Sequence, residues 1–167
     1  MEISVQVEAA AGAPAPVEYR WDTDTAILTA HLPQAADGKG MSGSVELAGN
    51  DGSWLVLDMH GGGIRGVEIA VWPDVQKQHG LQAPREVEAA RVTVPARKSA
   101  TEETVLQLDT TLVAEANPEE TVFHFRMGGH RAARTVRIAR DVLVDLDDRE
   151  VLSGLWLLNV PPFPADE

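Results

Sequence analysis

The chain has 167 residues, of which 44% are hydrophobic, and 26 acidic against 14 basic residues give it a formal net charge of −12. It contains no cysteine, so disulfides, thiolate zinc sites and a cysteine nucleophile are excluded. Binding of free nucleic acid is disfavoured, because the negative charge opposes contact with phosphate backbones and only 5% of the residues are aromatic.

Residues 1–9 alternate between apolar and polar side chains, with Ile3, Val5 and Val7 on one side. This period of two predicts a strand with one buried face. The segment lacks the basic start and long apolar run of a signal peptide, and no part of the chain has the roughly 18 consecutive apolar residues of a membrane helix. We therefore expect a cytoplasmic protein that does not contact a membrane.

The rest of the first half has the pattern of short strands separated by turns. Residues 17–21 and 26–32 predict a hairpin around the turn at residues 22–25, and residues 33–42 predict a mobile loop. Glycine-containing turns at residues 49–52 and 61–63 then separate three further strands, expected at residues 44–47, 54–58 and 64–71.

The second half follows a similar course, with turns expected at residues 117–120 and 147–150. Its strands are expected at residues 87–94, 104–116, 121–127, 135–138, 142–145 and 151–160. Residues 73–82 are the one stretch expected to form a helical turn, since they contain good helix formers after Pro73. The same stretch has the position of a linker between the halves.

The two halves also share a sequence pattern. Residues 55–73 align without a gap with residues 143–161, so that Gly66 meets Gly154 and Pro73 meets Pro161. Upstream, the hairpin ending at residue 32 aligns with the hairpin ending at residue 127, and the same strand face is apolar in both. The two halves thus agree in which strand face is apolar, in the positions of the turns, and in a glycine and a final proline. This agreement predicts an internal repeat.

These patterns predict an all-β fold, an internally duplicated antiparallel β-sandwich or barrel-like body of about 10–12 short strands with little helix. Residues 1–73 would form the first repeat, residues 74–86 a connector and residues 87–167 the second repeat. We expect one compact domain with pseudo-twofold symmetry, because each repeat alone would expose an apolar face.

Val144, Asp145 and Asp147, followed by Leu152 and Gly154, form a recognisable string, which Val56, Ile64 and Gly66 partly repeat. At these residues the chain resembles two divergent tandem copies of the bacterial domain of unknown function 2283, over about residues 17–73 and 112–161. The resemblance implies a bacterial protein with a β-rich duplicated fold, and it transfers no catalytic residue. In the ungapped alignment Leu57 stands where the family has an aspartate, and Glu150 where it has a turn glycine.

Two short strings contain groups typical of catalytic or metal sites. Asp58 and His60 lie two residues apart before a run of glycines, and a carboxylate can orient an imidazole as a general base. No serine or threonine partner is evident, so we interpret the string as a hairpin turn and keep the polar site as the alternative. Residues 145–150 suggest a calcium loop, but Arg149 occupies a ligand position and the required glycine is missing. We therefore expect an acidic, solvated turn there, and neither a metal site nor a cofactor.

Residues 121–140 contain five arginines and two histidines but no acidic residue. Arginine offers a planar fork that matches carboxylate or phosphate. One interpretation is an anion-binding site formed by Arg126, His130, Arg134, Arg137 and Arg140. The other is that this basic segment docks the acidic remainder of the same fold.

Two classes of function follow. The first is a non-catalytic binding or protein-interaction module, because no nucleophile, base and orienting group come together in the sequence. The second is a small-anion-binding protein or an enzyme that uses the arginine-rich strand with His124 or His130. The partner would be an unknown protein or a small anion. A homodimer is a further expectation, because residues 155–158 are apolar on both strand faces and require cover.

Overall fold

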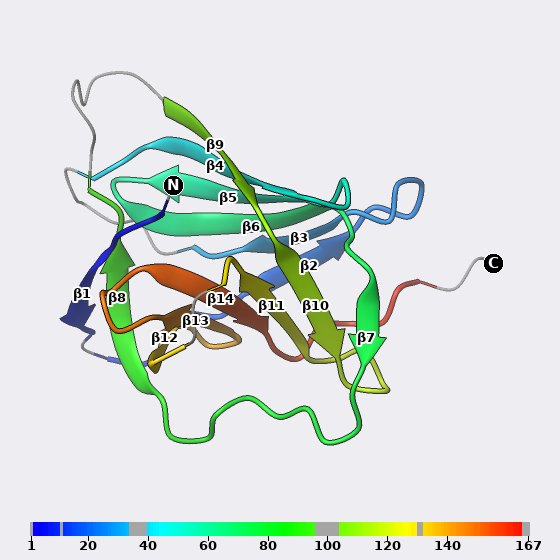
Figure 1. Cartoon of the computed structure of the whole chain (residues 1–167). Coiled ribbons are helices and arrows are strands. Elements are labelled where there is room, and N and C mark those ends of the chain that lie inside the picture. Colours follow the sequence, from blue (N-terminus) through cyan, green and yellow to red (C-terminus); the bar gives the residue numbers. More distant parts are fainter. Residues whose placement is uncertain (1, 11, 34–39, 96–103, 130–131, 165–167) are drawn as a thin grey trace.

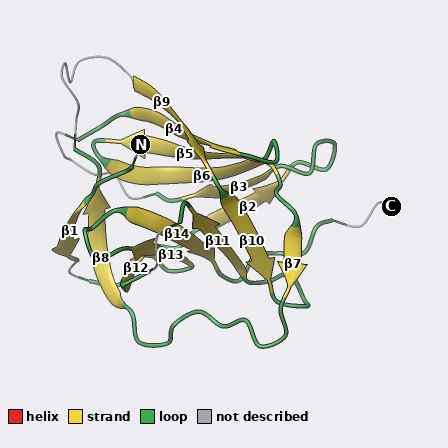
Figure 2. Cartoon of the chain, in the orientation of Figure 1, coloured by secondary structure: helices red, strands yellow, loops and turns green. Residues whose placement is uncertain are grey.

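The structure, a computed structural model, describes residues 2–10, 12–33, 40–95, 104–129 and 132–164. Every regular element in this part of the chain is a strand, as Figure 2 shows. The all-β prediction is therefore confirmed, although fourteen strands exceed the 10–12 expected. No helix capable of crossing a membrane occurs among the described residues. Most of the predicted 33–42 loop, the 96–103 connection, His130 and Arg131 lie outside them.

The strands follow the predicted order, and most bounds agree within a few residues. They are β1 (Gln6–Ala9), β2 (Glu18–Trp21), β3 (Leu28–His31), β4 (Gly43–Gly49), β5 (Trp54–His60), β6 (Gly63–Val71), β7 (Val75–Lys77), β8 (Glu88–Thr93), β9 (Thr104–Thr110), β10 (Leu112–Ala116), β11 (Phe123–Met127), β12 (Arg134–Ala139), β13 (Val142–Leu146) and β14 (Leu152–Leu157).

The strands form a curled, mixed sheet with the shape of a half-barrel (Figure 1). Its main path runs β7-β10-β11-β14-β13-β12-β8-β6-β5-β4-β9, while β2, β3 and β1 branch from it. The prediction of an antiparallel body was wrong in part, because β4 pairs in parallel with β9, β10 with β7 and β12 with β8. These three pairs join segments from different parts of the chain, which alternation within a single strand does not reveal.

Two groups of five strands have the same neighbour relations. In the first unit the order is β2-β3-β6-β5-β4, and in the second it is β10-β11-β14-β13-β12. Figure 1 shows the strands of the first unit above those of the second, with β8 and the long β9–β10 segment running between the two layers. The duplication itself remains a prediction, and these matching ladders support it.

The register corrects one part of the sequence alignment. Gly66 pairs with Asp58 across the first hairpin, and Gly154 pairs with Asp145 across the second. Each hairpin has a register shift directly after the aspartate, but the second turn is one residue longer. The ungapped alignment was therefore wrong by one residue along β5. Asp58, rather than Leu57, is the positional equivalent of Asp145.

The apolar side chains of both units meet in one hydrophobic core. Buried members from the first unit include Leu28, Leu55 and Ile69, and members from the second include Phe125 and Leu155. Each such side chain contributes about 1.5–3 kcal/mol when it is fully removed from water. Because the cluster is continuous between the layers, each unit buries its apolar face on the other.

The connector differs from its prediction. Instead of a helical turn it contains β7, which pairs in parallel with β10 through Val75 and Ala114. Helix propensity is a weak preference, and the free edge of β10 offers the backbone an alternative set of hydrogen bonds. The following residues, 78–87, lead to β8 and are called the strap below.

Candidate functional site

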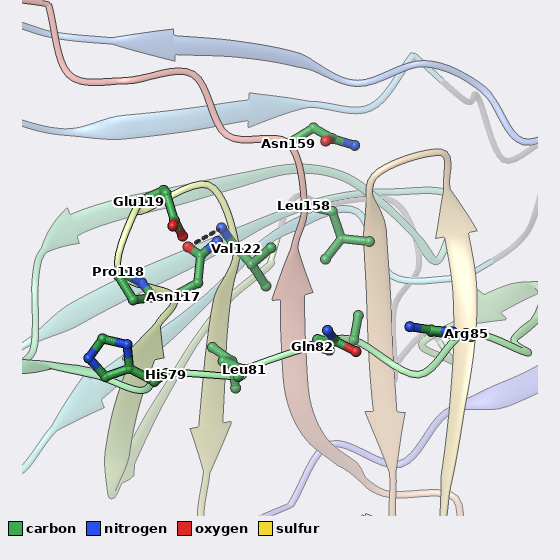
Figure 3. A pocket seen from close by; sticks show the side chains of 12 residues that line it. His79, Leu81, Gln82, Arg85, Asn117, Pro118, Glu119, Val122, Leu158 and Asn159 are labelled. Atoms are coloured by element: carbon green, nitrogen blue, oxygen red, sulfur yellow. Dashed lines mark hydrogen bonds between the residues drawn. The ribbon is translucent and has the colours of Figure 1, made fainter.

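The strap connects opposite edges of the second unit. It begins beside β10, where β7 pairs, and ends at β8, which pairs with β12. From β7 to β8 the sheet path has six inter-strand spacings, about 29 Å at about 4.8 Å each. Ten residues reach at most about 35 Å. Ten residues can therefore cross the curled sheet even though residues 78–81 form a turn, in which the Leu81 amide donates a 3.3 Å hydrogen bond to the Gln78 carbonyl. Figure 3 shows the strap passing over β11, β14, β13 and β12.

The strap lies on the face of the second unit that points away from the core. Phe123 and Phe125 of β11 belong to the core cluster, so the alternating residues Val122 and His124 point to the opposite, outer face. In the strap, Leu81 and Ala83 are half-buried, whereas most of their neighbours are exposed. The strap thus presents an alternating apolar side to the sheet and a polar side to water.

A groove of about 610 Å³ lies between the strap and the turn that joins β10 to β11. Leu81, Val122 and Leu158 supply its apolar surface, and Figure 3 shows their side chains together in the close view. The turn is held by Asn117, whose Oδ1 accepts hydrogen bonds from the backbone amides of Thr121 and Val122 at 2.8 and 3.0 Å. One wall of the groove is therefore fixed by local hydrogen bonds.

A histidine and an arginine of the strap line this groove. His79 and Arg85 are both exposed and lie toward opposite ends of it in Figure 3. Among the described residues, no carboxylate is within salt-bridge distance of Arg85. Glu119 on the opposite wall is the acidic lining residue. The groove therefore combines an apolar floor with a guanidinium that no described carboxylate engages.

Further along the same outer face lies a buried polar network centred on Asp145. Its Oδ2 is 2.7 Å from His124 Nε2, while its Oδ1 accepts a 2.6 Å hydrogen bond from the Thr135 hydroxyl and a 3.2 Å hydrogen bond from the Trp156 indole. The His124 ring stacks on Trp156, with centroids 3.9 Å apart. Both carboxylate oxygens of this 2% exposed aspartate are thereby satisfied.

The environment keeps Asp145 ionised. Burial opposes the charge, but hydrogen bonds from His124, Thr135 and Trp156 outweigh that effect and hold the pKa of Asp145 below its ordinary value of 3.8. The Thr135 hydroxyl donates to Asp145 and has no contact with His124 that would activate it as a nucleophile. The geometry therefore indicates a structural clamp between β11, β12, β13 and β14.

The arginines predicted to bind an anion are distributed over two strands and a turn. Arg126 lies on β11 and contacts Glu115 at 2.7 Å, whereas Arg134 on β12 contacts Glu88 and Glu150 at 3.6 and 3.4 Å. The strands β14 and β13 separate these two, which places β11 and β12 about 14 Å apart. These two arginines thus dock the chain's own acidic residues.

The remaining members of that predicted site are placed differently. Arg137 donates a hydrogen bond to the backbone carbonyl of Arg140, which follows β12 in the turn to β13. Neither has a carboxylate within salt-bridge distance in the part of the chain that is described. His130 lies outside the described residues.

The predicted Asp58–His60 site does not assemble as a pair. The Asp58 carboxylate accepts a 3.1 Å hydrogen bond from Arg65 and is 48% exposed, and His60 is exposed at the end of β5. The residues that follow, Gly61 and Gly62, have positive φ values of 57° and 87°, as a two-residue hairpin turn requires. This string is therefore explained by the turn.

The acidic string at residues 145–150 is less solvated than predicted. Asp145 and Asp147 are 2% and 5% exposed. Asp147 Oδ1 accepts hydrogen bonds from the amides of Arg149 and Val151, so this side chain closes the turn. No group of three or more histidine, aspartate or glutamate side chains within the described ranges is arranged to hold a metal ion.

Sequence reasoning missed the groove because its parts come from three distant segments. The strap was assigned to a connector, and Asn117 to a turn with no further role. One signal was available: Leu81, Ala83 and Val87 alternate with more polar residues, which is typical of an extended segment packed on one side.

Neither protein-family models nor curated proteins gave a match to this chain. The resemblance to the domain of unknown function 2283 therefore remains a prediction.

Proposed function

We propose that the protein is a non-catalytic binding module that holds an extended segment of a partner polypeptide in the groove beside the strap. The observation that carries this proposal is the combination of an apolar floor, Val122 and Leu158, with the guanidinium of Arg85 at its edge, which has no ion-pair partner among the residues that the structure describes. A segment with an apolar side chain followed by a carboxylate would satisfy both.

The openness of the groove favours a polypeptide over a small molecule. Small-molecule pockets enclose most of their ligand's surface. Here most lining residues are exposed, among them His79, Gln82, Pro118 and Asn159. A small ligand would stay largely in water, whereas an extended peptide continues beyond both ends and gains contact along its length.

A charge-reversal pair tests this proposal. Random peptides displayed on phage are selected on the wild-type chain, on Arg85→Glu and on Arg20→Glu, a matched control that reverses an exposed arginine on β2, outside the groove. We expect the wild type and Arg20→Glu to enrich the same peptides, with an acidic residue beside an apolar one. Arg85→Glu should lose them. Equal enrichment on Arg85→Glu, or none on the wild type, contradicts the proposal.

A second candidate is a small-anion site at the end of β12. It is favoured by Arg137 and Arg140, since the Arg137 guanidinium reaches the backbone of Arg140 and neither has an ion-pair partner among the described residues. The pairing of Arg126 and Arg134 with carboxylates weakens it, because each pair removes an arginine from the anion site.

A further inference from the structure

A pair of tryptophans lies at the seam between the two units. Trp21 ends β2, Trp72 directly follows β6, and their rings are stacked with centroids 5.7 Å apart and an interplanar angle of 18°. The Trp72 indole donates a 2.8 Å hydrogen bond to the carbonyl of Ala26, which fixes this ring. Trp72 also packs against Phe123 of the second unit at 5.2 Å. We call Trp21, Trp72 and the neighbouring Tyr19 the aromatic slot.

The chain's own C-terminal tail occupies this slot. The Trp21 indole donates a 2.9 Å hydrogen bond to the carbonyl of Pro161, and the ring of Phe163 meets Trp21 edge-on at 5.3 Å. One step earlier, the Tyr19 hydroxyl donates to the carbonyl of Leu158 at 2.8 Å. The slot therefore contacts the tail through one indole donor and one ring contact, and Tyr19 holds the backbone just before the tail.

The tail has the chemistry of a polyproline II segment. Residues 160–164 read Val-Pro-Pro-Phe-Pro, and proline has no amide hydrogen, so the carbonyl groups must supply most of the polar recognition. Aromatic-lined grooves bind such segments because the extended helix is already ordered before binding. A stacked tryptophan pair with an indole donor aimed at a proline carbonyl matches this mode.

The tail is only partly buried in the slot. Phe163 is 44% exposed although its ring touches Trp21, and Pro162 and Pro164 are exposed. Asn159, just before the tail, has a positive φ of 52°, a conformation that non-glycine residues adopt at a cost. The tail can therefore leave the slot without disturbing the buried core that ends at Val160.

We propose that the aromatic slot is a second interaction site, which binds a proline-rich segment with a Pro-Pro-aromatic pattern from a partner protein. The chain's own tail occupies this site and competes with the partner segment within the same molecule. The slot is formed mainly by the first unit and does not include the strap, and what it shares with the groove is the chain segment at Leu158 and Asn159.

The test uses the 167-residue chain and a labelled synthetic peptide with the sequence of residues 161–167, the part of the tail beyond the buried Val160. Phe163→Ala removes the ring contact of the tail and leaves the slot intact. We expect this variant to bind the peptide about tenfold more tightly than the wild type, since the attached tail competes at a high effective concentration. Fluorescence anisotropy measures both affinities.

Two controls decide whether the slot is responsible. Adding Trp21→Phe to Phe163→Ala keeps a ring but removes the indole donor, and binding should weaken about tenfold. Adding Trp54→Phe on β5 should leave binding unchanged. A peptide in which alanine replaces each proline should not bind. Absence of binding to Phe163→Ala, or equal binding after Trp21→Phe, overturns the proposal.

The Trp21→Phe variant could lose binding because it misfolds, so a second measurement follows Trp21 in a protein that keeps this residue. In ¹⁵N-labelled Phe163→Ala, the indole resonance of Trp21 should shift when the peptide is added, and that of Trp156 should stay in place. If the Trp21 resonance stays in place, the proposal is contradicted. If the wild-type chain instead forms tail-exchanged dimers that the peptide does not dissociate, the occupant is a second copy and the assignment to a partner protein is wrong.

Discussion

The carboxylate of Asp145 lies directly over the backbone of Gly154 on the neighbouring strand, so that a Cβ atom at Gly154 would come within 2.4 Å of Oδ2. The equivalent pair in the first unit is looser, because a Cβ at Gly66 would meet the nearest Asp58 atom at 3.5 Å. The two hairpins thus share a pairing but differ in how tightly the aspartate is held.

This difference predicts unequal effects of two identical substitutions. Gly154→Ala should lower the free energy of unfolding by about 2 kcal/mol or more, because the added methyl group displaces Asp145 from its hydrogen bonds. Gly66→Ala should change it by about 0.5 kcal/mol or less. Urea denaturation measures both. Similar losses in the two variants would show that the Asp145 clamp is not specific to the second unit.

The low pKa of Asp145 predicts a contribution to acid stability. A carboxyl group whose pKa is lower in the folded state stabilises the fold above its unfolded value of 3.8 and loses that contribution as the pH falls through the folded pKa. Asp145→Asn should therefore destabilise the protein at pH 7 and flatten the fall in stability below about pH 4.

Asp58→Asn is the matched control for that change, since the Asp58 carboxylate is 48% exposed and contacts a single arginine. Its loss of stability at pH 7 should be smaller than that of Asp145→Asn, because an exposed ion pair contributes about 0–1 kcal/mol. Thermal unfolding between pH 2.5 and pH 7 provides the comparison. An unchanged acid profile for Asp145→Asn would contradict the network described around this residue.

The shared core predicts that the halves do not fold separately. Residues 1–86 and residues 87–167, expressed alone, should aggregate or form dimers, because each exposes the apolar face that the other unit covers. Size-exclusion chromatography with light scattering gives the molecular mass. A well-folded monomeric half would show that the two units have independent cores.

The ion pairs of the arginine-rich segment predict weak binding of small anions. Thermal-shift measurements with phosphate, sulfate and dicarboxylates should show no saturable stabilisation, since Arg126 and Arg134 are engaged by Glu115 and Glu150. A saturable shift that Arg137→Glu abolishes would favour the anion site over the groove as the functional centre.

The sequence was most informative where local rules decide the structure. Alternation located the strands, and the residues of the turns at 61–62 and 117–120 fixed the hairpins around them. Local rules failed at β7, where an unpaired edge contributed by β10 overrode helix propensity. They also missed the one-residue offset along β5, because an alignment without gaps cannot represent turns of different length.

The candidate sites were harder to predict than the strands. Asp145 was assigned to a solvated turn because its neighbours in sequence are acidic, yet its environment is set by His124, Thr135 and Trp156 from three other strands. The groove depends on a strap whose course follows from the pairing of β7 and β8 with opposite edges of one unit. Contacts of this kind depend on which strands become neighbours in the sheet, and the local sequence pattern does not determine that.

The groove is tested most directly by adding a peptide selected on the wild-type chain to the ¹⁵N-labelled protein and recording its amide spectrum. We predict that the shifted resonances cluster at residues 79–85, 117–122 and 158–159, the segments that surround the groove. Shifts confined to β12 and its following turn, with the strap unchanged, would contradict the account.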